Sequence, residues 1–412
     1  MTPQSCNRLA GLAVVLALGV SACNPSAGNP ESFVTIDSAG IAIADNREPE
    51  WRVGGAWSLA ARPDLSIGQA EGDSTQQLYQ VAAAARIAAD TVIVVNAGTA
   101  EVRWYDRAGR FIRSVGRQGG GPGEFSRFGP GNLCIVSDSE ILVSDPGQQR
   151  ANVFTRAGEF VAVVQLAADA AFPSIQGCFA DGSLLAWRSV GSSDRIPGTI
   201  IQSQFIWSRL SANGERLADL VELPSSPQYL LDQGDGTATY HTIPFTTRPT
   251  AAASSEYLYA APGGPPVIEC RALTGTLDML IRWEPETRVQ SADVYDRYRA
   301  YTIDAQSSAQ RRTYWTRFFE LGLDTPDEIA AVSALQVDDA GYVWAERYRL
   351  PWDSAATWDV FAPNGRWLGG VALPREFRPL HMGNDFILGV SRDQLGVERV
   401  DSYHLQREGS SR

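Results

Sequence analysis

Two arginines that share the same neighbour could form an anion-binding site. Each is followed by proline, in Arg248-Pro249 and Arg378-Pro379, and each pair precedes a short apolar run. Proline is tolerated at the first residue of a strand, so both pairs mark strand starts. Two guanidinium groups at one mouth of the fold would bind an acidic ligand. The alternative is that each arginine makes a structural ion pair with a neighbouring repeat.

Aromatic and basic side chains near other predicted strands extend this candidate site. They would form a rim that binds a ligand through ring faces and charge. The alternative is that they pack beneath a helical segment, which is the more common use of buried aromatic side chains. The residues concerned are Trp187, Arg188, Trp344, Arg347, His381 and Tyr79.

No pattern in the chain identifies a catalytic residue or a dedicated metal site. The histidines, at positions 241, 381 and 404, are far apart and lack the neighbouring cysteines of a zinc site. Residues 232–236 (DQGDG) lack the alternating carboxylates and final glutamate of a calcium loop. There is no G-x-S-x-G serine elbow either. We therefore expect no cofactor, although a calcium ion held by carbonyls and carboxylates in a central channel stays possible.

Two cysteines stand at matching places in successive repeats. Cys134 and Cys178 each precede the turn that leads into an apolar run. First strands of neighbouring repeats would bring them together, so we predict a disulfide in an oxidising compartment. The alternative is a pair of small buried thiols. Cys270 falls at a different place in its repeat and is expected to be free.

The elements that would position these residues recur along the chain. Short apolar runs follow turns at 91–96, 141–144, 184–187, 257–260, 342–345 and 386–390. Most are followed by a second strand pair whose turn ends in glycine, at Gly109, Gly158, Gly214, Gly275 and Gly365. Glycine supplies the positive φ of such tight hairpins. This self-similarity predicts an all-β fold, a six-bladed β-propeller.

The interval between Gly275 and Gly365 is too long for one blade and contains a helical pattern. Between residues 291 and 323, aromatic and apolar residues recur at steps of three and four, as in Val294, Tyr295 and Tyr298. We predict one or two helices inserted between blades four and five, across one face of the propeller. Residues 325–328 (TPDE) have the form of a capping box for a further turn, or belong to a loop.

The beginning of the globular part is expected to complete the last blade. Residues 65–68 followed by Leu78-Tyr79 parallel residues 114–116 followed by Phe128. Residues 57–67 are therefore predicted to form the outermost strand of blade six, which closes the ring and removes an open edge. An earlier hairpin around 34–44 would pack outside the propeller or cap it.

Residues 1–22 have the pattern of a lipoprotein signal peptide. A basic residue precedes an apolar run at 9–20, and Val20-Ser21-Ala22-Cys23 resembles a lipobox. Lipidation of Cys23 would anchor the chain, because each buried CH₂ contributes about 0.8 kcal/mol. The alternative is an ordinary cleaved signal peptide. In the lipoprotein interpretation, residues 23–32 are a flexible tether and residues 33–408 form the propeller. Position 24 is asparagine and not the aspartate associated with inner-membrane retention, which favours the outer membrane.

Charge excludes one class of partner. The chain has 35 basic and 47 acidic residues, a formal net charge of −12. Non-specific nucleic-acid binding needs a basic footprint, so we expect no nucleic-acid partner. No stretch beyond the signal is apolar enough to span a bilayer.

Several segments resemble the NHL-like six-bladed β-propeller lipoproteins of bacteria. They are 33–45 (FVTIDSAGIAIAD), 102–125 (VRWYDRAGRFIRSVGRQGGGPGEF), 358–374 (WDVFAPNGRWLGGVALP) and 386–405 (FILGVSRDQLGVERVDSYHL). The resemblance implies a lipid-anchored binding or scaffold module of the cell envelope, which presents a propeller face to a protein, peptide or glycan. The alternative is a metal-dependent propeller hydrolase or lyase that acts in the central channel. No catalytic residue is carried over from such enzymes.

Overall fold

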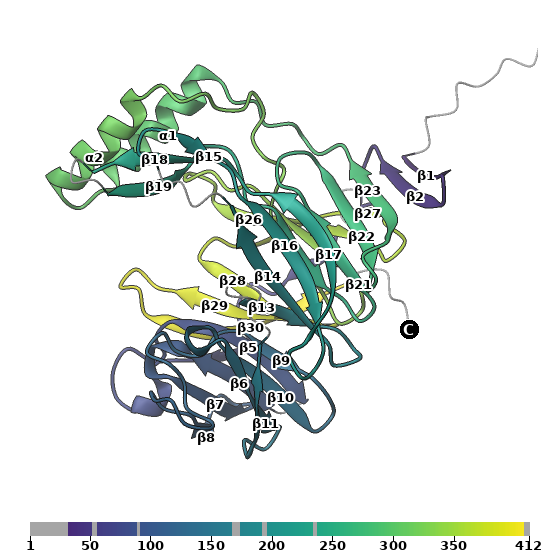
Figure 1. Ribbon diagram of the computed structural model, residues 1–412, viewed down its shortest axis with the longest axis vertical. Coiled ribbons are helices and arrows are strands. Elements are labelled where there is room, and N and C mark those ends of the chain that lie inside the picture. Colours follow the sequence, from purple (N-terminus) through teal and green to yellow (C-terminus); the bar gives the residue numbers. More distant parts are fainter. Residues whose placement is uncertain are drawn as a thin grey trace, which may run out of the picture. The chain divides into compact units, whose positions relative to one another are not determined.

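The computed structural model describes residues 32–51, 56–88, 91–166, 174–191, 196–233 and 237–407, a mostly β chain with two helices (Figure 1). The predicted signal peptide, Cys23, the tether up to residue 31 and part of the 232–236 loop lie outside these residues. No helix in the described part of the chain is long and apolar enough to cross a membrane.

Most strands form antiparallel sheets of neighbouring chain segments, which we name by their order. The first sheet contains β5 (Val81–Ala88), β6 (Thr91–Asn96), β7 (Glu101–Asp106) and β8 (Phe111–Val115). The second contains β9 (Leu133–Ile135), β10 (Glu140–Asp145), β11 (Arg150–Thr155) and β12 (Phe160–Gln165). The third contains β13 (Ser174–Cys178), β14 (Leu184–Val190), β16 (Gln204–Leu210) and β17 (Arg216–Pro224).

The remaining large sheets continue this order. The fourth contains β20 (Thr250–Ala253), β21 (Tyr257–Ala261), β22 (Val267–Ala272) and β23 (Leu277–Trp283). The fifth contains β24 (Val332–Val337), β25 (Val343–Arg347), β26 (Ala355–Phe361) and β27 (Trp367–Pro374). The last contains β28 (Phe377–Met382), β29 (Phe386–Arg392) and β30 (Glu398–Gln406). Each apolar run that the sequence marks lies in the second strand of one of these sheets.

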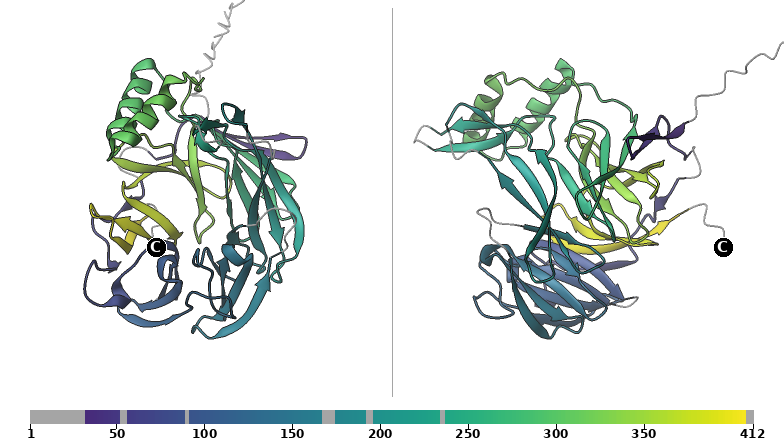
Figure 2. Two further views of the ribbon diagram at one scale, coloured as in Figure 1. Left: turned by 60° about the vertical axis from the view of Figure 1, so that its left-hand side comes forward. Right: turned by 45° about the vertical axis from the view of Figure 1, so that its right-hand side comes forward.

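Segments near the N-terminus complete two of the sheets. β3 (Ser58–Leu59) and β4 (Leu65–Ile67) pair with β30, in the place predicted for residues 57–67. β1 (Phe33–Ser38) and β2 (Ile41–Asn46) form the predicted hairpin, and β2 continues the fourth sheet in parallel with β23. The last sheet therefore combines β3 and β4 with the final strands of the chain, and it packs on the first sheet through Leu388, Val390 and Val92 (Figure 2).

The described chain has seven sheets, one more than the sequence predicts. The additional small sheet contains β15 (Ile200–Ile201), β18 (Gln228–Asp232) and β19 (Ala238–Thr242). Its Leu231 packs on Phe318 and Phe319 of a helix instead of on a neighbouring sheet. No repeat between residues 191 and 249 of the sequence predicts the strands of this small sheet.

The two helices lie within the predicted range 291–323. They are α1 (Ala292–Asp304) and α2 (Ala309–Glu320), between β23 and β24. Ser291 and Ser308 begin them, because each hydroxyl accepts a hydrogen bond from a backbone N–H three residues on. Residues 325–328 form no further helical turn; Glu328 pairs with Val289 in an isolated bridge. Figure 1 shows both helices beside the small sheet, and we call these five elements the side module.

Candidate functional site

A groove crosses the ends of the fourth and fifth sheets. Its largest part is a cavity of about 470 Å³. A cavity of about 300 Å³ adjoins it and shares Glu286, Arg288, Arg347 and Tyr348 with its lining. A third cavity, of about 230 Å³, shares Gly264, Glu328 and Ala330 with the largest one. We call these three adjoining cavities the groove.

Strand direction explains why distant segments meet at the groove. Neighbouring strands of the fourth and fifth sheets are antiparallel, so β21, β23 and β25 end on the side where β24 begins. The segments at these strand ends, at 262–266, 283–288, 328–331 and 347–349, supply much of the lining, and residues 224–227, 245–247 and 353–357 contribute the rest with a few single residues. Loops at strand ends tolerate changes of residue, which suits a binding surface on a rigid scaffold.

Arg288 fixes one wall of the groove. Its Nη1 and Nη2 donate to Oδ2 and Oδ1 of Asp353 at 3.0 and 3.1 Å, and Nη1 also donates to the carbonyl of Tyr348 at 3.1 Å. Oδ2 of Asp353 accepts a further hydrogen bond from the backbone N–H of Leu350 at 2.8 Å. The guanidinium thus joins the link after β23 to the loop after β25.

Arg347, one of the residues predicted to bind a ligand, lines the groove, but its guanidinium is bound by a buried carboxylate. Its Nε and Nη2 donate to Asp359 at 2.8 and 2.7 Å. The Asp359 side chain is 1% exposed and also accepts from the indole of Trp367. The hydrogen bonds with Asp359 raise the pKa of Arg347. Arg347 therefore presents a guanidinium whose charge is already balanced.

Arg349 and Glu346 form the third ion pair beside the groove. Nε of Arg349 and Oε1 of Glu346 are 3.0 Å apart, and Ser333 donates to the other carboxylate oxygen at 3.0 Å. Burial raises the pKa of Glu346, although Arg349 and Ser333 act in the opposite direction. Arg288, Arg347 and Arg349 therefore each have a carboxylate partner.

The two predicted anion-binding arginines do not contribute to the groove. Neither lines any part of the groove. Nη2 of Arg378 donates to the carbonyl of Val81 in β5 at 2.8 Å, so this side chain holds the last sheet to the first. Arg248 is exposed just before β20, and within the described residues its side chain makes no hydrogen bond or ion pair.

His381 lies near the other end of β28 from Arg378, and it also contacts the first sheet. Its Nδ1 accepts a hydrogen bond from the backbone N–H of Arg86 at 3.1 Å, and its Nε2 lies 3.1 Å from Oδ1 of Asp339. A ring nitrogen that accepts from a backbone N–H carries no proton, so Nε2 is the donor to Asp339. His381 therefore joins β5 of the first sheet to the segment after β24.

The aromatic members of the predicted rim have different surroundings. Trp344 is fully buried and donates to Asp338 at 3.0 Å, so it belongs to the core. Trp187 packs on Phe205, with ring centroids 5.1 Å apart. Arg188 is bound by Asp219 at 3.2 Å. These side chains therefore pack within and between the large sheets, and none of these contacts involves the helices.

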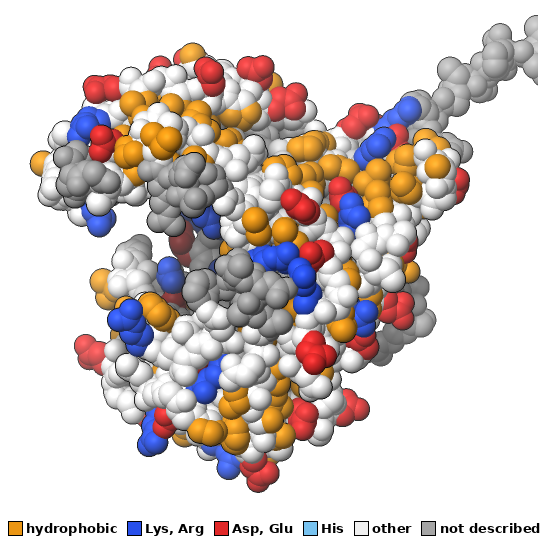
Figure 3. All heavy atoms as spheres, viewed as in Figure 1, with side chains coloured by type: hydrophobic (Ala, Val, Ile, Leu, Met, Phe, Trp, Pro, Cys, Tyr) orange, Lys and Arg blue, Asp and Glu red, His pale blue; other side chains and the backbone are white. Residues whose placement is uncertain are grey.

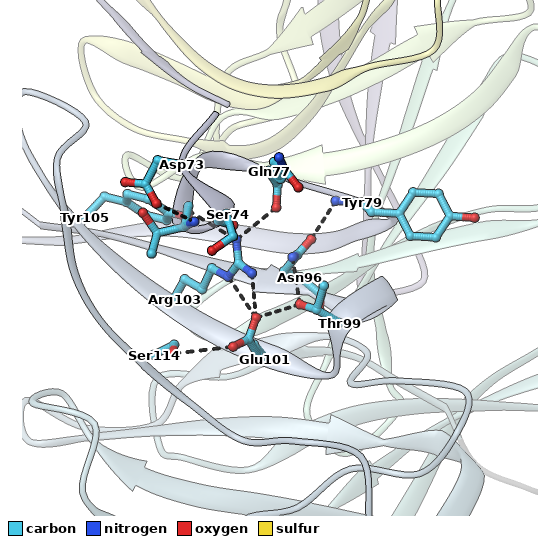
Figure 4. Close-up of polar contacts among 11 residues, drawn as sticks. Asp73, Ser74, Gln77, Tyr79, Asn96, Thr99, Glu101, Arg103, Tyr105 and Ser114 are labelled. Atoms are coloured by element: carbon cyan, nitrogen blue, oxygen red, sulfur yellow. Dashed lines mark hydrogen bonds and ion pairs between the residues drawn. The ribbon is translucent and has the colours of Figure 1, made fainter. Parts of the chain in front are cut away.

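Tyr79 is 61% exposed and extends away from a buried network in the connector before the first sheet (Figure 4). At the centre of that network, Arg103 donates to the carbonyls of Ser74, Thr75 and Gln77. Arg150 binds the glycine-rich connector before the second sheet in the same way, through the carbonyls of residues 120, 121 and 124. The glycine-rich run is therefore a structural connector.

Cys134 and Cys178 are free thiols in neighbouring sheets. They lie close enough for a hydrogen bond between them, which lowers the pKa of Cys178, while burial raises that of Cys134. We expect an exported form of the protein to join them in a disulfide that adds about 4 kcal/mol of stability. Mass spectrometry of unreduced peptides would detect the cross-link. Two alkylated cysteines in protein purified from an oxidising compartment would contradict this prediction.

His241 lies among Tyr314, Trp315 and Phe318 of α2, and its Nε2 contacts the hydroxyl of Tyr314. Burial lowers its pKa from the usual 6.5. A lowered pKa means that the unfolded chain binds the proton more readily, so stability is lost as pH falls below about 6.5. We expect faster hydrogen exchange of α2 amides at about pH 5.5 than at about pH 7.5, after correction for intrinsic rates. The difference should disappear in His241→Gln and persist in His404→Gln.

Within the described residues, no group of three or more His, Cys, Asp or Glu side chains has the arrangement of a metal site. The charged residues of the groove lining include three paired arginines and several exposed glutamates. Sequence reasoning missed Trp283, Glu286, Arg288, Glu328 and Asp353, because the segment 283–288 meets Glu328 and Asp353 only in the folded chain. The one signal that points to them is the run of charged residues directly after the end of β23 (WEPETR, 283–288).

No protein-family model matches the chain, and no curated protein matches it significantly. Solved structures are similar to it. A member of the DUF4221 family from Bacteroides vulgatus has a TM-score of 0.51 at 9% identity, over 85% of this chain and 98% of that one. For virginiamycin B lyase from Staphylococcus aureus the TM-score is 0.35 at 10% identity, over 85% and 100%.

The PQQ-bound aldose sugar dehydrogenase from Streptomyces coelicolor has a TM-score of 0.40 at 12% identity, over 85% of this chain and 99% of that one. The similar structures are β-propeller proteins, and identities this low concern the fold alone. The activities of the lyase and the dehydrogenase are properties of those proteins.

Proposed function

We propose that this chain is a binding module of the bacterial cell envelope, a six-bladed propeller that holds its ligand in the groove. The observation that carries the proposal is the groove itself. Its largest cavity, about 470 Å³, has the size of a ligand pocket and combines aromatic walls with a few fixed polar groups. Its extension into two further cavities suits an elongated ligand such as a peptide or a glycan.

The count of six blades is supported by contacts between the first strands of the large sheets. β5 contacts β9, β9 contacts β13, β13 contacts β20, β20 contacts β24, and β28 contacts β5. Between β24 and β28, Gln336 donates to the carbonyl of Pro379 at 2.8 Å. These contacts form a closed cycle. The small sheet of the side module would then be inserted within blade three and between blades three and four. The two helices would be the predicted insertion between blades four and five.

Lipid anchoring rests on the sequence alone. We propose that Cys23 is lipidated and that the tether holds the propeller outside the cytoplasm, at the outer membrane. The resemblance to NHL-like lipoproteins supports this proposal. Globomycin treatment of expressing cells, which blocks lipoprotein signal cleavage, should then leave the unprocessed chain, and Cys23→Ala should do the same. Normal cleavage in both cases would indicate an ordinary signal peptide.

Binding in the groove is tested by blocking it. Thr287 is exposed, lines the largest cavity and makes no side-chain hydrogen bond within the described residues. Thr287→Trp should fill the cavity without removing a contact. A peptide and glycan array probed with the full chain should give signals that Thr287→Trp abolishes. Thr276→Trp, in the exposed turn between β22 and β23, should leave them unchanged. Signals that are equal in both variants would place binding elsewhere.

The alternative function is a metal-dependent hydrolase or lyase that acts in the central channel. It rests on the resemblance, because backbone carbonyls and carboxylates can bind calcium without a dedicated loop. Metal analysis of the purified protein distinguishes the two. One equivalent of calcium that survives gel filtration would favour the enzyme.

A further inference from the structure

The charges of the groove do not balance. Arg288, Arg347 and Arg349 are each neutralised by a carboxylate, from Asp353, Asp359 and Glu346 in turn. These pairs leave the groove with little free positive charge.

The carboxylates that line the largest cavity have no such partners. Glu284, Glu286 and Glu328 are exposed, and within the described residues their side chains make no hydrogen bond or ion pair. Glu286 acts on Arg347 only through longer-range attraction. On the basic side, Arg47 is the one arginine of the largest cavity whose side chain has no partner within the described residues. Unpaired negative charge therefore exceeds unpaired positive charge, in a protein whose net charge is −12.

Two buried polar atoms of the lining also lack partners among the described residues. The indole N–H of Trp283, a residue 3% exposed in the largest cavity, donates no hydrogen bond to any of them. Neither does the hydroxyl of Ser226, a residue 4% exposed in the third cavity. A buried donor without an acceptor costs free energy, which a ligand that supplies a carbonyl would recover after a small rearrangement.

We propose that the groove binds an extended peptide segment that carries lysine or arginine side chains. The cationic side chains face Glu284, Glu286 and Glu328, and the peptide carbonyls provide acceptors along the lining. Tyr348, a half-buried aromatic residue of the lining, adds attraction for a cation. The negative charge of the whole protein favours the approach of such a segment. This proposal rests on the groove being the binding site, and it reverses the acidic ligand that the sequence predicts.

The proposal is tested by calorimetric titration of the full chain with tetralysine and with tetraglutamate. The test variant is Glu284→Gln/Glu286→Gln/Glu328→Gln. The control variant, Glu159→Gln/Glu215→Gln/Glu256→Gln, makes the same change of charge at exposed turns at the other ends of the strands. All three proteins are checked for equal unfolding midpoints.

We expect tetralysine to bind, with affinity roughly tenfold weaker or more in the test variant and changed by less than about twofold in the control. Equal losses in both variants would overturn the proposal, because only net charge would then matter. Displacement of tetralysine by one equivalent of calcium would also overturn it, in favour of a metal site. If tetraglutamate binds more tightly than tetralysine and Thr287→Trp abolishes its binding, the proposal of a basic ligand is wrong. The proposal that the groove is the binding site would then be supported. Binding of neither peptide, with an empty peptide and glycan array, would overturn both proposals.

Discussion

Arg407→Ala is expected to lower the free energy of unfolding by about 3 to 5 kcal/mol, because it leaves a buried carboxylate without its cation. Nη2 of Arg407 lies 2.6 Å from Oδ2 of Asp338, whose side chain is fully buried. The guanidinium also lies 4.2 Å from the ring centroid of Trp57 and donates to the carbonyl of Gly383 at 3.0 Å. One side chain thus joins the end of β30 to the fifth sheet and to the segment before β3.

The size of this effect depends on the charge of Asp338, which the double variant measures. Asp338→Asn removes the carboxylate while it keeps an acceptor for the indole of Trp344. Arg407→Ala combined with Asp338→Asn should therefore cost less than the sum of the single changes. Arg407→Lys should cost less than Arg407→Ala, because it keeps the charge. Urea unfolding followed by tryptophan fluorescence gives these values, and a loss under about 1 kcal/mol for Arg407→Ala would contradict the prediction.

Gly214→Ala should be the more damaging of two matched glycine substitutions. Gly214 and Gly40 have nearly the same backbone conformation, with φ of +83° and +85°. A Cβ at Gly214 would lie 2.1 Å from the carbonyl oxygen of Gln165, whereas at Gly40 nothing lies within 4 Å. Both changes cost about 1 to 2 kcal/mol for the left-handed conformation. Gly214→Ala should cost about 1 to 3 kcal/mol more, because the backbone of β12 must move.

Urea unfolding of both alanine variants isolates the clash from the backbone conformation. If Gly214→Ala and Gly40→Ala lower the free energy of unfolding equally, the close contact between Gly214 and the carbonyl of Gln165 is contradicted. Gly365 offers an independent check, since a Cβ there would lie 2.6 Å from the Cβ of Ala44.

Local sequence patterns were sufficient wherever a segment's own residues decide its structure. The step of three and four from Val294 to Tyr298 lies in α1, and the five predicted turn glycines all have positive φ. The place of residues 57–67 could be predicted because Leu65–Gly68 repeats the pattern of a later connector. In each case the information lies within a few residues.

Burial and charge pairing depended on residues far away in the chain. Trp344 has the strand position of a rim residue, and only its contacts with Asp338 and Trp57 place it in the core. The sequence around Arg347 does not reveal its carboxylate partner, Asp359, which lies in the neighbouring strand β26. The small sheet was missed for a similar reason: Leu231 finds its apolar partners, Phe318 and Phe319, in a helix much later in the chain.

The pairing of β3 and β4 with β30 also sets an order of events during biogenesis. Residues 58–67 are among the first of the globular part to be synthesised, yet their partner strand is almost the last. They must stay unpaired until the ribosome has nearly finished, and pairing at such sequence separation is slow. A chain that crosses a membrane unfolded would keep this last sheet open throughout translocation, so maturation could finish only after release on the far side.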